Sequence, residues 1–119
     1  MGKRVLIVED QFVTALDEKQ IMLRMGFDVT DIVTSGEEAV ELAGRNKPDV
    51  ILMDYLLAGE MNGREAALKI RELDNIPVIF VTAFGDKEAS RANVPEDIGY
   101  IVKPFTEAEL ESEITRLIG

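Results

Sequence analysis

The stretch VLIVED, residues 5–10, ends a run of four apolar residues with two adjacent carboxylates. The apolar run is typical of a strand that is buried on both faces of a sheet. Two neighbouring negative charges repel each other, and removing them from water costs still more free energy. Glu9 and Asp10 therefore need an explanation beyond packing, and we expect them to hold a divalent metal ion together with a third carboxylate, Asp54.

Two further apolar runs resemble the first one. VILM at residues 50–53 and VIFV at residues 78–81 lack the alternation of a half-exposed strand, so with residues 5–8 they predict the central strands of a sheet. FDVTDIV at residues 27–33 does alternate, and together with GYIV at residues 99–102 it predicts the edge strands. Amphipathic segments separate the strands. This alternation predicts an α/β fold, in which five helices cover both faces of a five-stranded parallel sheet.

Capping residues mark the starts of three of these helices. A serine, asparagine or threonine that is followed three positions later by glutamate can satisfy free N–H groups of the first helical turn. The pairs are Ser35 with Glu38, Asn62 with Glu65, and Thr106 with Glu109.

The first helix is predicted to end at Gly26, because glycine adopts the left-handed conformation of a helix end without steric cost. Apolar side chains at helical spacing predict its buried face. These residues are Phe12, Ala15, Leu16 and Leu23.

Polar residues follow directly after four of the predicted strands. They are Glu9, Asp10, Asp54, Thr82 and Lys103. The carboxyl ends of parallel strands meet at one edge of a sheet, which is where such sheets bind ligands. We therefore expect these five side chains to lie close together.

Three carboxylates at one edge would destabilise each other. Each like-charged pair about 4 Å apart costs roughly 4 kcal/mol at an effective dielectric constant near 20. A hard divalent cation with oxygen ligands relieves this repulsion, which favours Mg²⁺, with Mn²⁺ as an alternative. The competing interpretations are that Glu9 and Asp10 only cap the following helix, that Asp54 is an ordinary loop residue, and that Lys103 is a surface lysine before a turn proline.

The composition excludes several classes of protein. The 119 residues include no cysteine and no histidine, which excludes disulfides, thiolate metal sites and a phosphohistidine within this chain. A net charge of −10 without a dense cluster of Lys and Arg argues against direct binding of nucleic acid. No apolar run approaches the roughly 18 residues of a membrane span, and MGKRVLIV is not a signal peptide. We expect a single cytoplasmic domain over residues 1–119 that does not contact a membrane.

The segments together resemble the receiver domain of response regulators. The matching stretches are VLIVED, PDVILMD around Asp54, MNG soon after it, VIFVTA around Thr82 and GYIVKPF around Lys103. They occur in the order and at the spacing of that family, and they cover almost the whole chain. The resemblance implies a flavodoxin-like sheet with strand order 2-1-3-4-5 and a phosphoacceptor domain of two-component phosphorelay signalling.

The resemblance also implies roles for the residues at the sheet edge. Asp54 would accept a phosphoryl group from a phosphohistidine on a sensor histidine kinase or phosphotransfer protein. Mg²⁺ would be held by Glu9, Asp10, Asp54 and the main-chain carbonyl of Leu56. The phosphoryl oxygens would be contacted by Thr82, by the backbone amide of Ala83 and by Lys103.

Two further features follow from the resemblance. Tyr100 occupies the aromatic switch position, where it would fill the space that Thr82 leaves when it approaches the phosphoryl group; the alternative is an ordinary strand residue. The Lys103–Pro104 peptide bond is typically cis in this family. A downstream effector would then bind the face formed by the fourth helix, the fifth strand and the fifth helix.

The sequence departs from the family pattern in places. Ala58 stands where many receivers have proline, and the loop YLLAGEMNG at residues 55–63 is one residue longer than the commonest one. The fourth helix is predicted to span only about residues 86–93, because Pro95 follows closely.

Two positions commonly tune hydrolysis of the acyl phosphate in this family, and here they are Leu56 and Phe84. Both are apolar here and predict a long-lived acyl phosphate. An aspartyl-nucleophile phosphatase usually carries a second aspartate where Leu56 stands, so that activity is disfavoured. A receiver-like adaptor that works without phosphate would not need five costly polar residues, and no glycine-rich turn supports dinucleotide binding.

Overall fold

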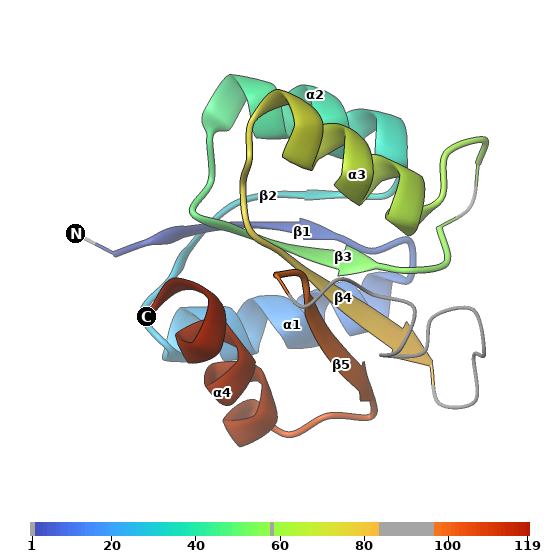
Figure 1. Cartoon of the computed structure of the whole chain (residues 1–119). Helices are drawn as coiled ribbons and strands as arrows, with labels where there is room; N and C mark the ends of the chain where they lie inside the picture. The colour runs from blue at the N-terminus through green and yellow to red at the C-terminus, as the bar shows by residue number, and fades with distance from the viewer. Residues whose placement is uncertain (1, 58, 84–96) are drawn as a thin grey trace.

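A computed structural model of the chain describes residues 2–57, 59–83 and 97–119. The core of the fold is one parallel five-stranded sheet with strand order β2-β1-β3-β4-β5, as predicted (Figure 1). Its strands are β1 (Arg4–Val8), β2 (Asp28–Val33), β3 (Val50–Asp54), β4 (Val78–Ala83) and β5 (Gly99–Lys103).

Helices cover both faces of this sheet (Figure 1). The described residues form α1 (Phe12–Arg24), α2 (Gly36–Asn46), α3 (Gly63–Leu73) and α4 (Glu107–Ile118). Helices α2 and α3 lie on one face, and α1 and α4 lie on the other. The short helix expected at residues 86–93 falls outside the described residues. Within the described part of the chain, no helix has both the length and the apolar character that crossing a membrane requires.

The three central strands each contain an uninterrupted run of four apolar residues, because both of their faces are buried. In β1, Leu6 and Val8 pack into the core beneath α2 and α3, whereas Val5 and Ile7 pack into the core beneath α1 and α4. All five residues of β3 are buried. The absence of alternation in the sequence thus has the predicted cause.

Two of the three predicted capping boxes form in full, at Asn62 with Glu65 and at Thr106 with Glu109. The third is only half formed. The Ser35 hydroxyl accepts a hydrogen bond from the Glu38 backbone N–H at 3.2 Å. The Glu38 carboxylate, however, accepts from the hydroxyls of Ser35 and Thr34, because these donors lie within its reach at 3.0 and 3.3 Å.

Helix α1 ends as predicted at Gly26, whose φ is +89°. The Gly26 N–H donates to the Leu23 carbonyl at 3.0 Å, and the Phe27 N–H donates to the Met22 carbonyl at 2.9 Å. This paired arrangement satisfies two carbonyls of the last helical turn.

The predicted inner face of α1 is wrong except at Ala15. Phe12 is 76% exposed, Leu16 is 39% exposed and Leu23 is 45% exposed. The helix buries another stripe, formed by Ala15, Glu18, Ile21 and Met22. Only three residues connect β1 to α1, so the helix cannot rotate freely about its axis, and the stripe that faces the sheet is set by this connection.

Candidate functional site

Three carboxylates come together at the carboxyl edge of the sheet, as the sequence predicted. Glu9, Asp10 and Asp54 each offer an oxygen atom, and these atoms all lie within 4.8 Å of one another. Glu9 and Asp54 are buried, whereas Asp10 is exposed to solvent. The cluster is therefore held by the fold on one side and open to an incoming ion on the other.

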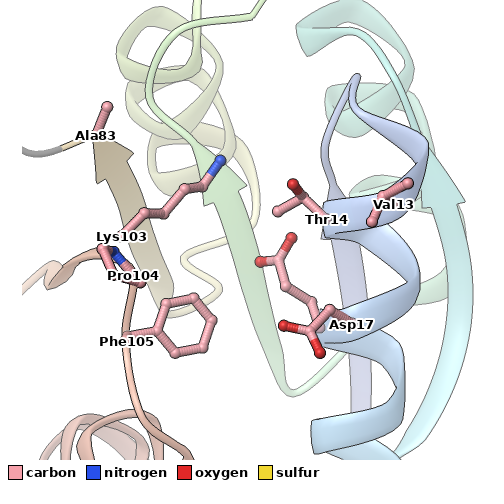
Figure 2. Close-up of a pocket in the computed structure, with 8 residues that line it drawn as sticks. Val13, Thr14, Asp17, Ala83, Lys103, Pro104 and Phe105 are labelled. Carbon is pink, nitrogen blue, oxygen red and sulfur yellow. The ribbon is translucent and has the colours of Figure 1, made fainter.

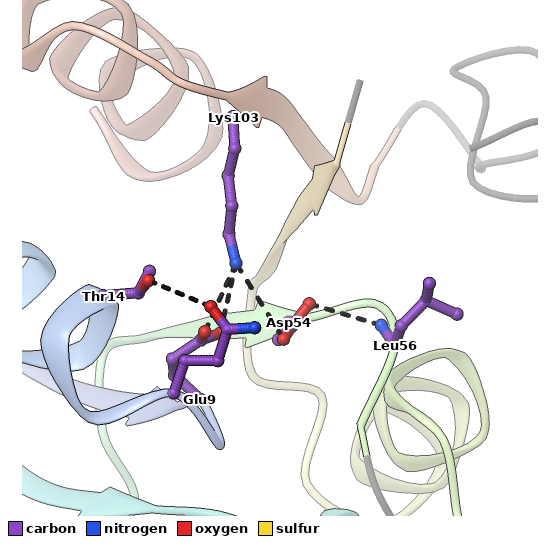
Figure 3. Close-up of polar contacts among 6 residues, drawn as sticks. Glu9, Thr14, Asp54, Leu56 and Lys103 are labelled. Atoms are coloured by element: carbon purple, nitrogen blue, oxygen red, sulfur yellow. Dashed lines mark hydrogen bonds and ion pairs between the residues drawn. The ribbon is translucent and has the colours of Figure 1, made fainter. Parts of the chain in front are cut away.

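Lys103 reaches this cluster from the far side of β4 (Figure 3). Its Nζ lies 3.3 Å from Glu9 Oε1 and 3.9 Å from Asp54 Oδ2. The side chain is only 25% exposed. The alternative interpretation of Lys103 as a solvated surface lysine is thus wrong, because its ammonium group is paired with buried carboxylates.

The electrostatics of the cluster are most evident at Glu9. Its pKa is raised to about 7, first because burial disfavours the charged form and then because Asp54 lies beside it. Lys103 acts in the opposite direction and lowers the pKa. A metal cation bound in place of the proton on Glu9 would relieve the repulsion between the Glu9 and Asp54 carboxylates.

Asp10 does not cap the following helix. The N-cap residue of α1 is Gln11, and its side chain makes no capping hydrogen bond. The alternative interpretation of Glu9 and Asp10 as helix caps is therefore wrong, whereas their position in the carboxylate cluster is as predicted.

The backbone after β3 orients the Asp54 carboxylate. The Leu56 N–H donates to Asp54 Oδ1 at 3.3 Å (Figure 3). This contact holds Oδ1 toward the loop, and Oδ2 is the oxygen nearer to Lys103. Asp54 is thus part of an ordered site, and not an ordinary loop residue.

Thr82 lies near the end of β4 with a buried hydroxyl that has no hydrogen-bond partner among the described residues. An unsatisfied buried hydroxyl typically costs about 1–3 kcal/mol. The neighbouring Ala83 is exposed and pairs in register with Lys103, so the two residues end their strands side by side. The hydroxyl of Thr82 is available for an acceptor that arrives from outside.

The other site residues are placed as follows. Tyr100 is half-buried near the start of β5 and packs against the core beneath α2 and α3. The Lys103–Pro104 peptide bond is cis, in agreement with the expectation. Phe84 and Ala58 lie outside the described residues.

Comparisons with known proteins decide the family. The sequence model of the "Response regulator receiver domain" matches residues 5–115. The chain belongs to the response regulator receiver domain family. The receiver domain is therefore a signalling domain of a two-component system, with the flavodoxin-like fold of its family.

The receiver domain has relatives of different lengths. It is 35% identical to the chemotaxis protein CheY of Thermotoga maritima, and the match covers 98% of each chain. It is 30% identical to the phyllosphere-induced regulator PhyR of Methylorubrum extorquens, where the match covers 99% of this chain but only 44% of PhyR. Among solved structures, it is similar to the receiver domain of the sensor histidine kinase PA1611 from Pseudomonas aeruginosa. That likeness has a TM-score of 0.85 at 34% identity, and covers 100% of this chain and 99% of the other.

Sequence reasoning missed two residues near the site of this receiver domain. A Cβ atom on Gly63 would lie 2.0 Å from the Asp54 carbonyl oxygen, so only glycine lets the start of α3 approach the phosphoacceptor strand. The MNG motif contained this signal. Glu18 is the second residue, and its only signal was its helical spacing from Ala15 and Met22 in the buried stripe of α1.

Proposed function

We propose that this receiver domain accepts a phosphoryl group on Asp54 from the phosphohistidine of a sensor histidine kinase or phosphotransfer protein. The observation that carries the proposal is the cluster of Glu9, Asp10 and Asp54 within 4.8 Å, with Lys103 3.9 Å from Asp54 Oδ2. The chain contains no histidine, so the phosphorylated histidine must come from a partner.

The donor set fits Mg²⁺. The three clustered ligands are hard carboxylate oxygens of Glu9, Asp10 and Asp54. The main-chain carbonyl oxygen of Leu56 is expected to add a fourth ligand of the same kind. Mn²⁺ accepts the same ligands and is expected to substitute. The related receiver domain of PA1611 was solved with a magnesium ion coordinated in its active site cleft, which supports this assignment. When bound, the ion would neutralise charge on the transferred phosphoryl group.

The residues of the chain perform the remaining tasks. An oxygen of Asp54 attacks the phosphorus atom, the bond between phosphorus and the partner's histidine nitrogen breaks, and that nitrogen keeps the electron pair. Lys103 supplies positive charge beside the phosphoryl oxygens, and the Thr82 hydroxyl and the Ala83 backbone amide donate hydrogen bonds to them. The hydrogen bond from the Leu56 N–H holds the Asp54 carboxylate in one orientation for this attack.

Phosphorylation would then change which partner the domain binds. The Thr82 hydroxyl, which has no partner among the described residues, moves towards the new phosphoryl oxygens and donates a hydrogen bond to them. Tyr100 then moves into the space that Thr82 has left. The altered face includes β5 and α4, and it binds a downstream effector. The apolar residues at positions 56 and 84 are expected to slow hydrolysis of the acyl phosphate.

Intact-mass measurement tests the proposal. The purified chain is incubated with a small phosphodonor such as acetyl phosphate, with and without Mg²⁺. We expect one added phosphoryl group that requires the metal, is lost in Asp54→Asn and persists in Asp28→Asn, a matched change at an exposed aspartate.

Two other outcomes would each support a different function. Metal binding without phosphoryl addition would favour an adaptor that works without phosphate. Continuous release of phosphate from unrelated esters would favour an aspartyl-nucleophile phosphatase.

A further inference from the structure

Helix α1 buries a carboxyl group that the phosphoryl chemistry does not use. Glu18 is 2% exposed, and its Oε1 atom has no hydrogen-bond partner among the described residues. Its pKa is raised to about 8, mainly by burial and next by the charge of Glu9. Lys103 acts in the opposite direction, and Asp54 and Asp17 add further repulsion. A carboxyl group in this state is stabilised by any hydrogen-bond donor that reaches it.

Glu18 lines a cavity of about 520 Å³ between α1 and the connection from β5 to α4. The volume lies within the range of about 300–1,000 Å³ that is typical of small-molecule sites. In Figure 2, Val13, Thr14 and Asp17 of α1 face Lys103, Pro104 and Phe105 across the cavity.

The lining indicates the chemistry of a ligand. Val13, Pro104 and Phe105 provide apolar walls, and Asp17 adds an exposed carboxylate to the buried one. Lys103 is the only cation among the described lining residues, and its ammonium group is already paired with Glu9 at 3.3 Å. The groups left to pair with a ligand are thus the exposed carboxylate of Asp17 and the buried carboxyl of Glu18, and the space next to them is apolar.

We propose that this cavity binds a small organic cation, with its protonated amine at Glu18 and its apolar body between Val13 and Phe105. The ammonium group supplies the donor that Glu18 lacks, and the body covers the apolar walls. Because Lys103 forms part of the wall, an occupied cavity places the ligand beside the residue that pairs with Asp54.

Nuclear magnetic resonance tests the site without metal or phosphodonor, so its outcome is independent of the proposed function. The ¹⁵N-labelled chain is titrated at pH 7 with phenethylammonium chloride, and the amide shifts of Val13, Thr14 and Phe105 are followed. We expect saturable shifts at these residues. Uncharged 2-phenylethanol should bind at least about tenfold more weakly, since a hydrogen bond to a charged group is lost.

Matched variants assign the binding to Glu18. Glu18→Gln keeps the shape of the side chain and should weaken phenethylammonium binding about tenfold or more. Glu72→Gln, an exposed change on α3 at the opposite face of the sheet, should leave it unchanged. Asp17→Asn is exposed and should not disturb folding, and we expect it to weaken binding by a smaller factor.

Proton release provides a second measure of the same event. Glu18 is largely protonated at pH 7, and a bound ammonium group favours its charged form, so binding should release protons. Calorimetry in two buffers of different ionisation enthalpy detects this release, which Glu18→Gln should reduce.

Three results would overturn the proposal. The first is the absence of saturable shifts at millimolar phenethylammonium. The second is equal affinity in the wild-type chain and Glu18→Gln. The third is a response of these amides to a lysine-containing peptide alone, which would assign the cavity to a side chain of a partner protein.

Discussion

The two faces of the sheet are built differently. On the face of α2 and α3, small residues such as Ala39, Ala43, Ala66 and Ala67 are fully buried, so the helices pack closely against the strands. On the face of α1 and α4, the buried stripe of α1 includes Glu18, and cavities of about 520 and 290 Å³ border the helices. The face of α2 and α3 is thus closely packed, whereas the face of α1 and α4 leaves a cavity and a buried carboxyl group beside the functional site.

Core truncations on the two faces should show the largest difference. Ile70→Ala in α3 removes a fully buried side chain from the closely packed face and should lower the free energy of unfolding by about 4 kcal/mol. Ile114 in α4 borders the cavity of about 290 Å³. Ile114→Ala should therefore lower the free energy of unfolding by only about 2 kcal/mol, because fewer packing contacts are lost. Urea denaturation measures both, and equal losses would remove the distinction between the faces.

Gly63→Ala tests how closely the packed face approaches the site. The added Cβ would meet the Asp54 carbonyl oxygen at 2.0 Å, and relieving this clash should cost about 3 kcal/mol of stability. We also expect weaker Mg²⁺ binding, because the Asp54 backbone must move. Gly44→Ala is the matched control in α2, where the Cβ meets only Asp74 Oδ2 at 3.6 Å. It should raise stability by up to about 1 kcal/mol, and similar losses in both variants would contradict the role of Gly63.

On the face of α1 and α4, the buried Glu18 should make the stability of the fold depend on pH. The pKa of Glu18 is 4.5 in a model peptide and about 8 in the folded chain. Between these values the folded state retains a proton that the unfolded state has lost, so stability falls as the pH rises. The total loss should be on the order of a few kcal/mol. Urea denaturation from pH 5 to pH 8 should show a shallower decline for Glu18→Met, and identical slopes would disprove the contribution of Glu18.

The smallest effect is expected on the exposed side of α1. Phe12→Ser should change the free energy of unfolding by less than about 0.5 kcal/mol, because Phe12 is 76% exposed. Met22→Ser in the buried stripe of the same helix should cost several times more. Thermal denaturation of the two variants compares the stability that each stripe contributes. A large loss of stability in Phe12→Ser would support the buried face of α1 that the sequence predicted.

Local sequence patterns predicted most of the fold. The uninterrupted apolar runs identified the central strands, and the caps at Asn62 and Thr106 identified two helix starts. Gly26 marked the end of α1. The rule that ligands bind at the carboxyl edge of a parallel sheet predicts Asp54 beside Glu9 and Asp10, where the structure has it. These features depend on residues that are close in the chain, or on the topology that strict alternation of strands and helices implies.

The amino-acid sequence is therefore sufficient to predict the order of the elements and the edge of the sheet where the polar residues gather. The folded structure is needed to show which stripe of α1 is buried, that Glu18 lies within it, and that Lys103 extends past β4 to reach Glu9. The physical reason is that a helical period defines stripes but not which one faces the sheet. That choice, and the pKa values that follow from it, depend on connection length, packing and charges from segments far apart in the chain.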